Sequence, residues 1–99
     1  MARHDLYPNP GNPGYLLDVQ TDLLDGLNTR IVVPVLPEGV APTPARLLNP
    51  GFDIDGERHY LMTQFMASVP AASLRSPVAN LSDRSDDVTR ALDMIFQGY

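Results

Sequence analysis

Proline and glycine limit what this chain can fold into more than any other feature. Ten prolines and seven glycines occur in 99 residues, and they divide the chain up to about residue 80 into short pieces. The densest runs, PNPGNPG at 8–14 and PEGVAPTP at 37–44, predict loops. Between them lie segments rich in β-branched, aromatic or leucine residues, which favour strands: YLLDVQTD (15–22), TRIVVPVL (29–36) and FDIDGERHYLMTQF (52–65).

A tight hairpin is predicted inside the third of these segments. Asp55 and Gly56 lie between two stretches of alternating polarity. Both central residues of a two-residue hairpin turn need a positive φ, and Asp-Gly is a strongly preferred pair for that turn. We therefore expect the residues on either side of Asp55 and Gly56 to pair as antiparallel strands.

The end of the chain has the pattern of a helix. Ser82 is expected to cap its N-terminus, acidic residues follow in the first turns, and Gly98 is expected to end it. The apolar residues recur with helical spacing and should form one face packed against the strands: Val88, Ala91, Leu92, Ile95 and Phe96. The sequence thus predicts one domain over residues 1–99, mostly β, with a small antiparallel sheet or barrel and one C-terminal helix.

Composition narrows the possible partners and chemistry. Twelve acidic side chains against seven arginines give a net charge of −5, which repels phosphate backbones, so we expect a protein partner and no direct nucleic-acid binding. The absence of cysteine and lysine excludes thiolate and Schiff-base chemistry. No apolar run approaches the roughly 20 residues of a membrane-spanning helix, and residues 1–15 lack the apolar core of a secretory signal. We expect a cytoplasmic protein without a membrane association.

Candidate metal ligands are few. The stretch DIDGE at 53–57 resembles the start of a calcium loop, but Gly56 comes fourth instead of sixth, and Gln64 stands where such a loop needs a bidentate Glu. We interpret it as the hairpin turn. His4 and His59 are far apart in the sequence, and we interpret both as strand-surface residues. No metal and no cofactor are expected.

Three aspartates are the remaining candidates for catalysis. Asp18, Asp22 and Asp25 could act together as a general acid–base group. Aspartates also collect at strand ends and turns, where the carboxylate accepts backbone hydrogen bonds. We favour this second interpretation and expect no catalytic residues.

Four segments resemble the CcdB family of bacterial toxins: LDVQTDLLD (17–25), TRIVVPVL (29–36), LMTQFMASVP (61–70) and VANLSDRSDDVTRALDMIFQGY (78–99). The four segments resemble the family in their order and spacing, and the resemblance runs over nearly the whole chain. The resemblance implies the SH3-like barrel of the CcdB, Kid and MazF toxins, with an antiparallel sheet and a C-terminal helix. It also implies a homodimer that is not an enzyme. Such a dimer binds the A subunit of DNA gyrase and traps its covalent complex with cleaved DNA, and a CcdA-like antitoxin with a disordered C-terminal segment neutralises it.

The resemblance further implies where gyrase would bind. The contact tip of the family is the end of the C-terminal helix, which reads Trp-Gly-Ile in the type member and Gln97-Gly98-Tyr99 here. The end of the second strand and outward-facing helix positions supply the other contacts. The gyrase-binding residues implied in this chain are Gln97, Gly98, Tyr99, Thr21, Leu23, Leu24, Arg90 and Asp93.

Two other functions stay open. Tryptophan is among the commonest hot-spot residues of interfaces, so Gln97 in its place leaves room for a relative that has lost or changed its target but still binds an antitoxin. The third possibility is an endoribonuclease of the MazF and Kid type. RNA cleavage on this fold requires a basic groove, which a chain of net charge −5 does not favour.

Overall fold

A computed structural model describes residues 2–99 of the protein. Short strands and 3-10 turns make up most of the chain, and a helix follows at the end. The strands are β1 (Asp5–Pro8), β2 (Tyr15–Asp18), β3 (Thr29–Pro37), β4 (Gly51–Ile54), β5 (Glu57–Leu61), β6 (Ala67–Pro70) and β7 (Ala79–Asn80). The helical elements are the 3-10 turns η1 (Asp22–Leu24), η2 (Thr63–Phe65), η3 (Ala71–Ser73) and η4 (Ser82–Arg84) and the helix α1 (Ser85–Gln97).

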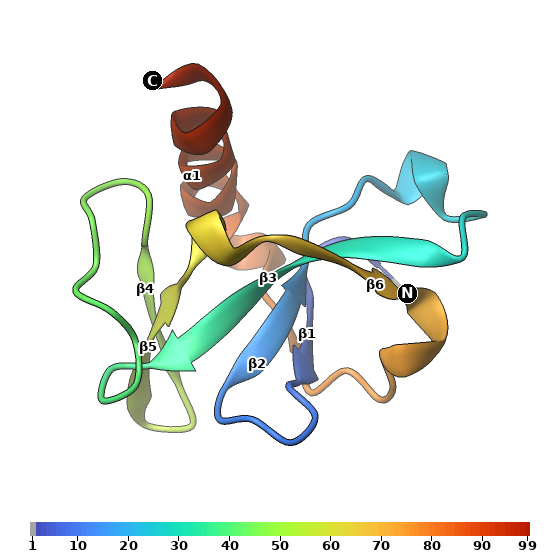
Figure 1. Cartoon of the computed structure of the whole chain (residues 1–99), viewed down its shortest axis with the longest axis horizontal. Helices are drawn as coiled ribbons and strands as arrows, with labels where there is room; N and C mark the ends of the chain where they lie inside the picture. The colour runs from blue at the N-terminus through green and yellow to red at the C-terminus, as the bar shows by residue number, and fades with distance from the viewer. Residues whose placement is uncertain (1) are drawn as a thin grey trace.

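Strand β3 organises the sheet. Its first half pairs with β6 from Thr29 to Val32, and its last residues pair with β5 from Val35 to Pro37. The sheet order is β4-β5-β3-β2-β1-β7 with β6 also on β3, and all the pairings are antiparallel. Figure 1 shows β3 as a long band through this curled half-barrel, with α1 projecting beyond the strands. The prediction of a mostly β, SH3-like fold with one C-terminal helix is confirmed.

The predicted hairpin is also confirmed. Asp55 has a φ of 52° and Gly56 a φ of 77°, so both central residues have the positive φ that a two-residue turn requires. On either side, Ile54 pairs with Glu57 and Asp53 with Arg58. The hairpin forms because this turn chemistry coincides with two stretches of alternating polarity.

Three short strands were not anticipated. The predicted loop at 8–14 begins one residue late, because Pro8 ends β1, which pairs with β2 on one side and β7 on the other. Strand β7 has two residues, and β6 spans only Ala67–Pro70. Strands this short carry almost no alternating pattern, so their pairing with distant segments decides their conformation.

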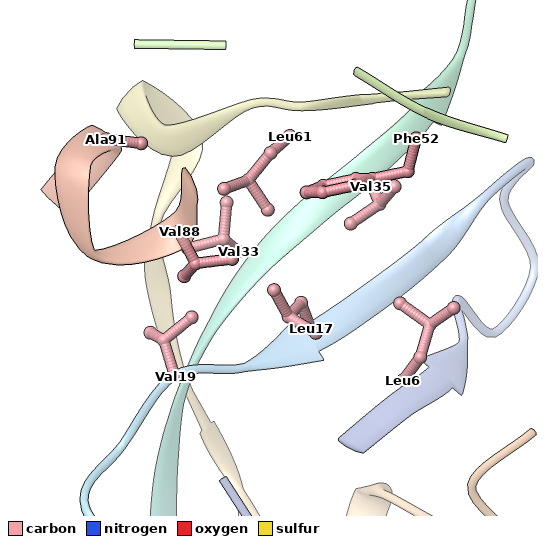
Figure 2. Close-up of a cluster of buried hydrophobic side chains, with 9 residues drawn as sticks. All are labelled: Leu6, Leu17, Val19, Val33, Val35, Phe52, Leu61, Val88 and Ala91. Atoms are coloured by element: carbon pink, nitrogen blue, oxygen red, sulfur yellow. The ribbon is translucent and has the colours of Figure 1, made fainter. Parts of the chain in front are cut away.

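The main core lies between the sheet and the first turns of α1. Figure 2 shows its side chains: Leu6, Leu17, Val19, Val33, Val35, Phe52, Leu61, Val88 and Ala91. Within this set α1 contributes Val88 and Ala91, both fully buried. A smaller cluster consists of Tyr7, Val32 and Leu74, in which Tyr7 and Val32 are strand residues that alternate with Leu6 and Val33 of the main core and Leu74 follows η3.

The helix differs from the prediction at both ends. Ser82 is not its cap, because Ser82 opens η4 and α1 begins at Ser85; the amide of Ser82 instead donates to Asn80 Oδ1 at 2.9 Å. The predicted stop at Gly98 is confirmed, with a φ of 82°. The expectation that Phe96 packs in the core is wrong, because its side chain is 71% exposed.

The apolar stripe of α1 is longer than the surface that it covers. Ile95 is 39% exposed and Leu92 is half-buried, so burial falls steadily toward the C-terminus. Phe96 lies about 12 Å further along the helix axis than Val88, at about 1.5 Å per residue. The last turn therefore extends past the sheet and carries its apolar side chains uncovered.

Candidate interaction surface

An apolar groove opens between the end of β2 and the last turns of α1. Its volume is about 370 Å³. Residues from four separate parts of the chain line it: Val19, Gln20, Thr21, Leu24, Ile31, Met66, Leu92 and Phe96. Concave apolar surfaces of this kind are typical of binding sites, because contact with a partner removes their side chains from water.

One wall of the groove belongs to a tight turn that we call the Leu23 corner, residues 20–25. Thr21 precedes η1 in an extended conformation, and its Oγ1 accepts a hydrogen bond from the Leu23 amide at 3.3 Å. This hydroxyl cap turns the chain so that Leu23 projects outward, with 92% of its surface exposed, while Leu24 is 48% exposed. The corner thus presents two leucines to the solvent.

The other wall belongs to α1, whose end carries the predicted contact tip. Gly98 ends the helix in the left-handed conformation, and its amide donates to the carbonyls of Asp93 and Met94. Tyr99 follows with 83% of its surface exposed. Gln97 donates from Nε2 to Asp93 Oδ1 at 3.4 Å, so its amide is held against its own helix.

The structure brings some of the predicted site residues together and separates others. Thr21 and Leu24 line the groove opposite Phe96, which directly precedes Gln97. Leu23 projects from the same corner without lining the groove. Arg90, Asp93 and Gln97 follow one another at helical spacing on the side of α1 away from Val88, and Arg90 lies 4.0 Å from Asp87.

Phe96 is the groove residue for which the sequence-based prediction is wrong. Helical spacing puts it on the same broad face as Val88, and this face was expected to be core. The spacing of apolar residues predicts which face of a helix is apolar. It does not predict how much of the length of that face the sheet covers. The position of Phe96 next to the tip would not have located the groove, because the fold decides that Phe96 lines it together with Thr21 and Leu24.

The end of the chain holds two aromatic residues, Phe96 and Tyr99. Both are largely exposed, at 71% and 83%. Phe96 belongs to the last turn of α1, and Tyr99 follows the left-handed Gly98 that ends the helix. The helix end therefore carries two exposed aromatic side chains, of which Phe96 lines the apolar groove.

The three candidate aspartates gather around a buried arginine and not around an open pocket. Arg30 lies 2.8 Å from Asp18 Oδ2, and both side chains are almost fully buried. Asp18 Oδ1 also accepts a hydrogen bond from the Gln20 amide at 3.0 Å, as expected for an aspartate at a strand end. Burial raises the pKa of the Asp18 carboxyl, although the Arg30 guanidinium and the Gln20 amide act in the opposite direction. These contacts occupy the carboxylate, so the cluster is suited to holding the chain in place.

The interpretation of both histidines as strand-surface residues is wrong. His59 is 3% exposed and packs against Tyr15, with ring centroids 5.4 Å apart, and its Nδ1 lies 2.9 Å from the Glu57 carbonyl. His4 is 7% exposed, has a positive φ of 74°, and its Nε2 has no hydrogen-bond partner within residues 2–99. Burial, together with the charge of Arg3, lowers the pKa of His4.

Within residues 2–99, no three side chains of the His, Cys, Asp or Glu type are arranged to hold a metal ion. Over the same residues, none of the helices has the length and apolar character needed to cross a membrane.

The fold and the groove together define a class of protein. A curled antiparallel half-barrel that leaves leucines and aromatic residues uncovered at one end is a small SH3-like module with a surface suited to a protein partner. The family model described as CcdB protein matches residues 3–98, and the chain belongs to the CcdB family. Membership of this family makes the chain the toxin of a toxin–antitoxin pair.

Proposed function

We propose that this toxin acts, as a single domain and without enzyme activity, by binding the A subunit of DNA gyrase and trapping its complex with cleaved DNA. The observation that carries the proposal is the groove. Thr21 and Leu24 from one implied contact region share it with Phe96, which directly precedes the other region, Gln97 to Tyr99. Two segments more than 70 residues apart in the sequence thereby form one surface.

The chemistry of this surface supports a protein target. Phe96 and Tyr99 are 71% and 83% exposed, and buried aromatic side chains often anchor the centre of interfaces. Leu23, 92% exposed, adds apolar surface beside them that a partner can cover. A net charge of −5 and an apolar groove do not suit an RNA substrate, which disfavours the ribonuclease alternative.

The tip differs from that of the type member, and the differences suggest how binding would be retained. Gln97 replaces the tryptophan, and its amide hydrogen-bonds to Asp93 of the same helix. Phe96 and Tyr99 supply exposed aromatic surface on either side of it. We infer that these two residues take over the aromatic contacts of the missing tryptophan.

A homodimer fits the same uncovered stripe. Ile95, on the apolar stripe of α1, remains 39% exposed after α1 has packed on its own sheet, and it is not needed for the proposed gyrase contact as Phe96 is. A symmetric contact between two copies would bury part of this stripe and stabilise a small domain. The proposed active form is therefore a cytoplasmic homodimer.

The antitoxin is expected to be a CcdA-like protein whose C-terminal segment is disordered until it binds. Arginines in that segment would complement the net charge of −5. Binding to the folded toxin alone raises its melting temperature by mass action. An unchanged melting temperature with an excess of the product of the adjacent gene would contradict the pairing.

The decisive experiment incubates the purified protein with gyrase and supercoiled plasmid, beside an RNA cleavage assay. We expect linear plasmid to accumulate after the trapped complex is denatured, and intact RNA. Leu23→Ser should abolish the linear product, whereas Val78→Ser should not, because Val78 is similarly apolar and 56% exposed but lies in neither of the implied contact regions. Relaxed plasmid with no linear product would favour the changed-target alternative, and cleaved RNA would favour the ribonuclease.

A further inference from the structure

Arg30 is the largest side chain that is fully buried in the described residues, with 1% of its surface exposed. It lies near the start of β3, beside the Leu23 corner. Taking a guanidinium out of water is expensive unless its charge and its hydrogen-bond donors are satisfied. The polar contacts of the Arg30 guanidinium therefore indicate its role.

The guanidinium reaches several parts of the corner at once. Its Nε and Nη2 each lie 2.8 Å from Asp18 Oδ2, at the end of β2. Its Nη1 lies 3.5 Å from Asp25 Oδ1, and its Nη2 lies 3.8 Å from Asp22 Oδ1 and 3.4 Å from the Gln20 carbonyl. Arginine suits this position because its planar group presents donors in several fixed directions.

Other polar contacts hold the same turn. The Gln20 side chain accepts from the Ile31 amide at 3.1 Å and donates to the Leu24 carbonyl at 3.2 Å. The Arg3 amide donates to Asp22 Oδ1 at 2.9 Å. None of the residues of η1 is buried. Apolar packing consequently contributes little to the order of the corner, and these polar contacts have to provide it.

We propose that Arg30 is a positioning residue, which holds the Leu23 corner so that the exposed Leu23 side chain is a preformed anchor for the partner. The proposal rests on the proposed function for the identity of that partner, the gyrase A subunit. A loop already held in its bound conformation loses less conformational entropy on binding, and this strengthens the complex without adding contacts. Asp22 and Asp25 join the corner to Arg30, and Asp18 balances its charge.

Testing this role requires a variant that loses the contacts of Arg30 but still folds. Replacing a buried ion pair by apolar residues of similar volume is often neutral for folding or stabilising. Arg30→Met combined with Asp18→Leu should therefore leave a folded protein whose corner has lost its central contacts. The matched control is Arg58→Met with Asp53→Leu, which makes the same substitutions at an exposed ion pair of 3.4 Å on the β4–β5 hairpin.

Two measurements test the proposal. Backbone ¹⁵N order parameters of residues 21–25 should fall from about 0.85 to below about 0.6 in the Arg30/Asp18 variant and stay unchanged in the control. Affinity for the gyrase A subunit should fall about tenfold in the Arg30/Asp18 variant alone. In a double-mutant cycle, this tenfold effect should disappear when Leu23→Ala is already present, because Arg30 then has no anchor to position.

Several results would overturn the proposal. The first is that the order parameters of residues 21–25 stay high in the Arg30/Asp18 variant. The second is that the affinity of this variant for the gyrase A subunit does not change. The third is that the affinity falls by the full tenfold even when Leu23→Ala is already present. If the Arg30/Asp18 variant does not fold, Arg30→Lys replaces it, since lysine keeps the charge beside Asp18 but lacks the planar fork, and the same two measurements decide. If the wild-type protein does not bind the gyrase subunit, the proposed function fails, and the order parameters still decide whether Arg30 holds the corner.

Discussion

Val88 and Phe96 lie on the same broad face of α1, yet shortening each to alanine should have opposite consequences. Val88 is fully buried in the main core, whereas Phe96 is 71% exposed. Val88→Ala removes buried methyl groups and leaves a cavity, which should lower the free energy of unfolding by about 2 kcal/mol. Phe96→Ala should change the free energy of unfolding of a single protomer by less than about 0.5 kcal/mol, as for most surface substitutions.

The effect on partner binding should be reversed. A phenylalanine side chain presents roughly 200 Å² when fully exposed, so 71% exposure leaves about 140 Å² to be buried by a partner. At about 25 cal/mol per Å² this area corresponds to about 3.5 kcal/mol as an upper limit. Ordering costs at an interface reduce that gain, and we expect a net loss of about 1.5 to 2 kcal/mol in Phe96→Ala, or roughly ten- to thirtyfold in affinity.

The assay pairs urea unfolding with calorimetric titration of the gyrase A subunit. Unfolding is measured at two protein concentrations, because dimerisation makes apparent stability depend on concentration. Val78→Ala, at an exposed position outside the groove, is the control for both readouts. A Phe96→Ala midpoint that falls as far as that of Val88→Ala at the lower concentration would show that Phe96 is core after all. Unchanged affinity for gyrase would show that the groove is not the binding surface.

Three further predictions concern association, pH and the tip. Light scattering at micromolar concentration should give the mass of a homodimer, and a monomeric mass would contradict the symmetric contact. Because the pKa of His4 is lowered in the folded state, the unfolded state binds more protons below about pH 6.5, so stability should fall as the pH is lowered through that range. Urea midpoints at pH 7.5 and 5.5 should therefore differ less in His4→Asn, which tolerates the positive φ, and an equal difference would refute this role. Gly98→Arg and removal of residues 97–99 should each leave a folded dimer that retains at least part of its antitoxin binding but no longer traps cleaved DNA. Gly98→Arg should lower the free energy of unfolding by about 1 kcal/mol, because it strains only the left-handed cap of α1. Circular dichroism and the plasmid assay check both, and a variant that unfolds or still traps DNA would contradict the assignment of the tip.

Local sequence signals account for the elements that could be predicted. The Asp55-Gly56 turn has the required φ values within two residues, and the length of β3 follows from a run of β-branched residues. The pairing of β1 with β7 joins Asp5 to Asn80, a contact for which the intervening residues give no local signal. Such strands follow from the closure of the sheet and not from their own residues.

The candidate site was predictable only in part for a similar reason. The resemblance placed contacts at Thr21, Leu24 and the helix end, but helical periodicity placed Phe96 in the core. Periodicity fixes the direction in which a side chain points, and the extent of the sheet decides whether anything covers it. The role of Arg30 was also invisible, since its contact with Asp18 connects residues that are 12 positions apart on neighbouring strands.

Under the proposed function, folding and partner binding use different residues of this toxin, and this separation would explain how its tip can differ from that of the type member. Val88 and Ala91 attach α1 to the core, whereas Phe96 and Tyr99 lie beyond it and remain largely exposed. The Leu23 corner is held by polar contacts and contributes no buried residue through η1. Substitutions at the tip or at Leu23 therefore change the binding surface with little effect on the free energy of unfolding. We infer that Gln97 and Tyr99 are substitutions of this kind, because neither side chain contributes to the core clusters, so selection on the target can alter them while the half-barrel stays the same.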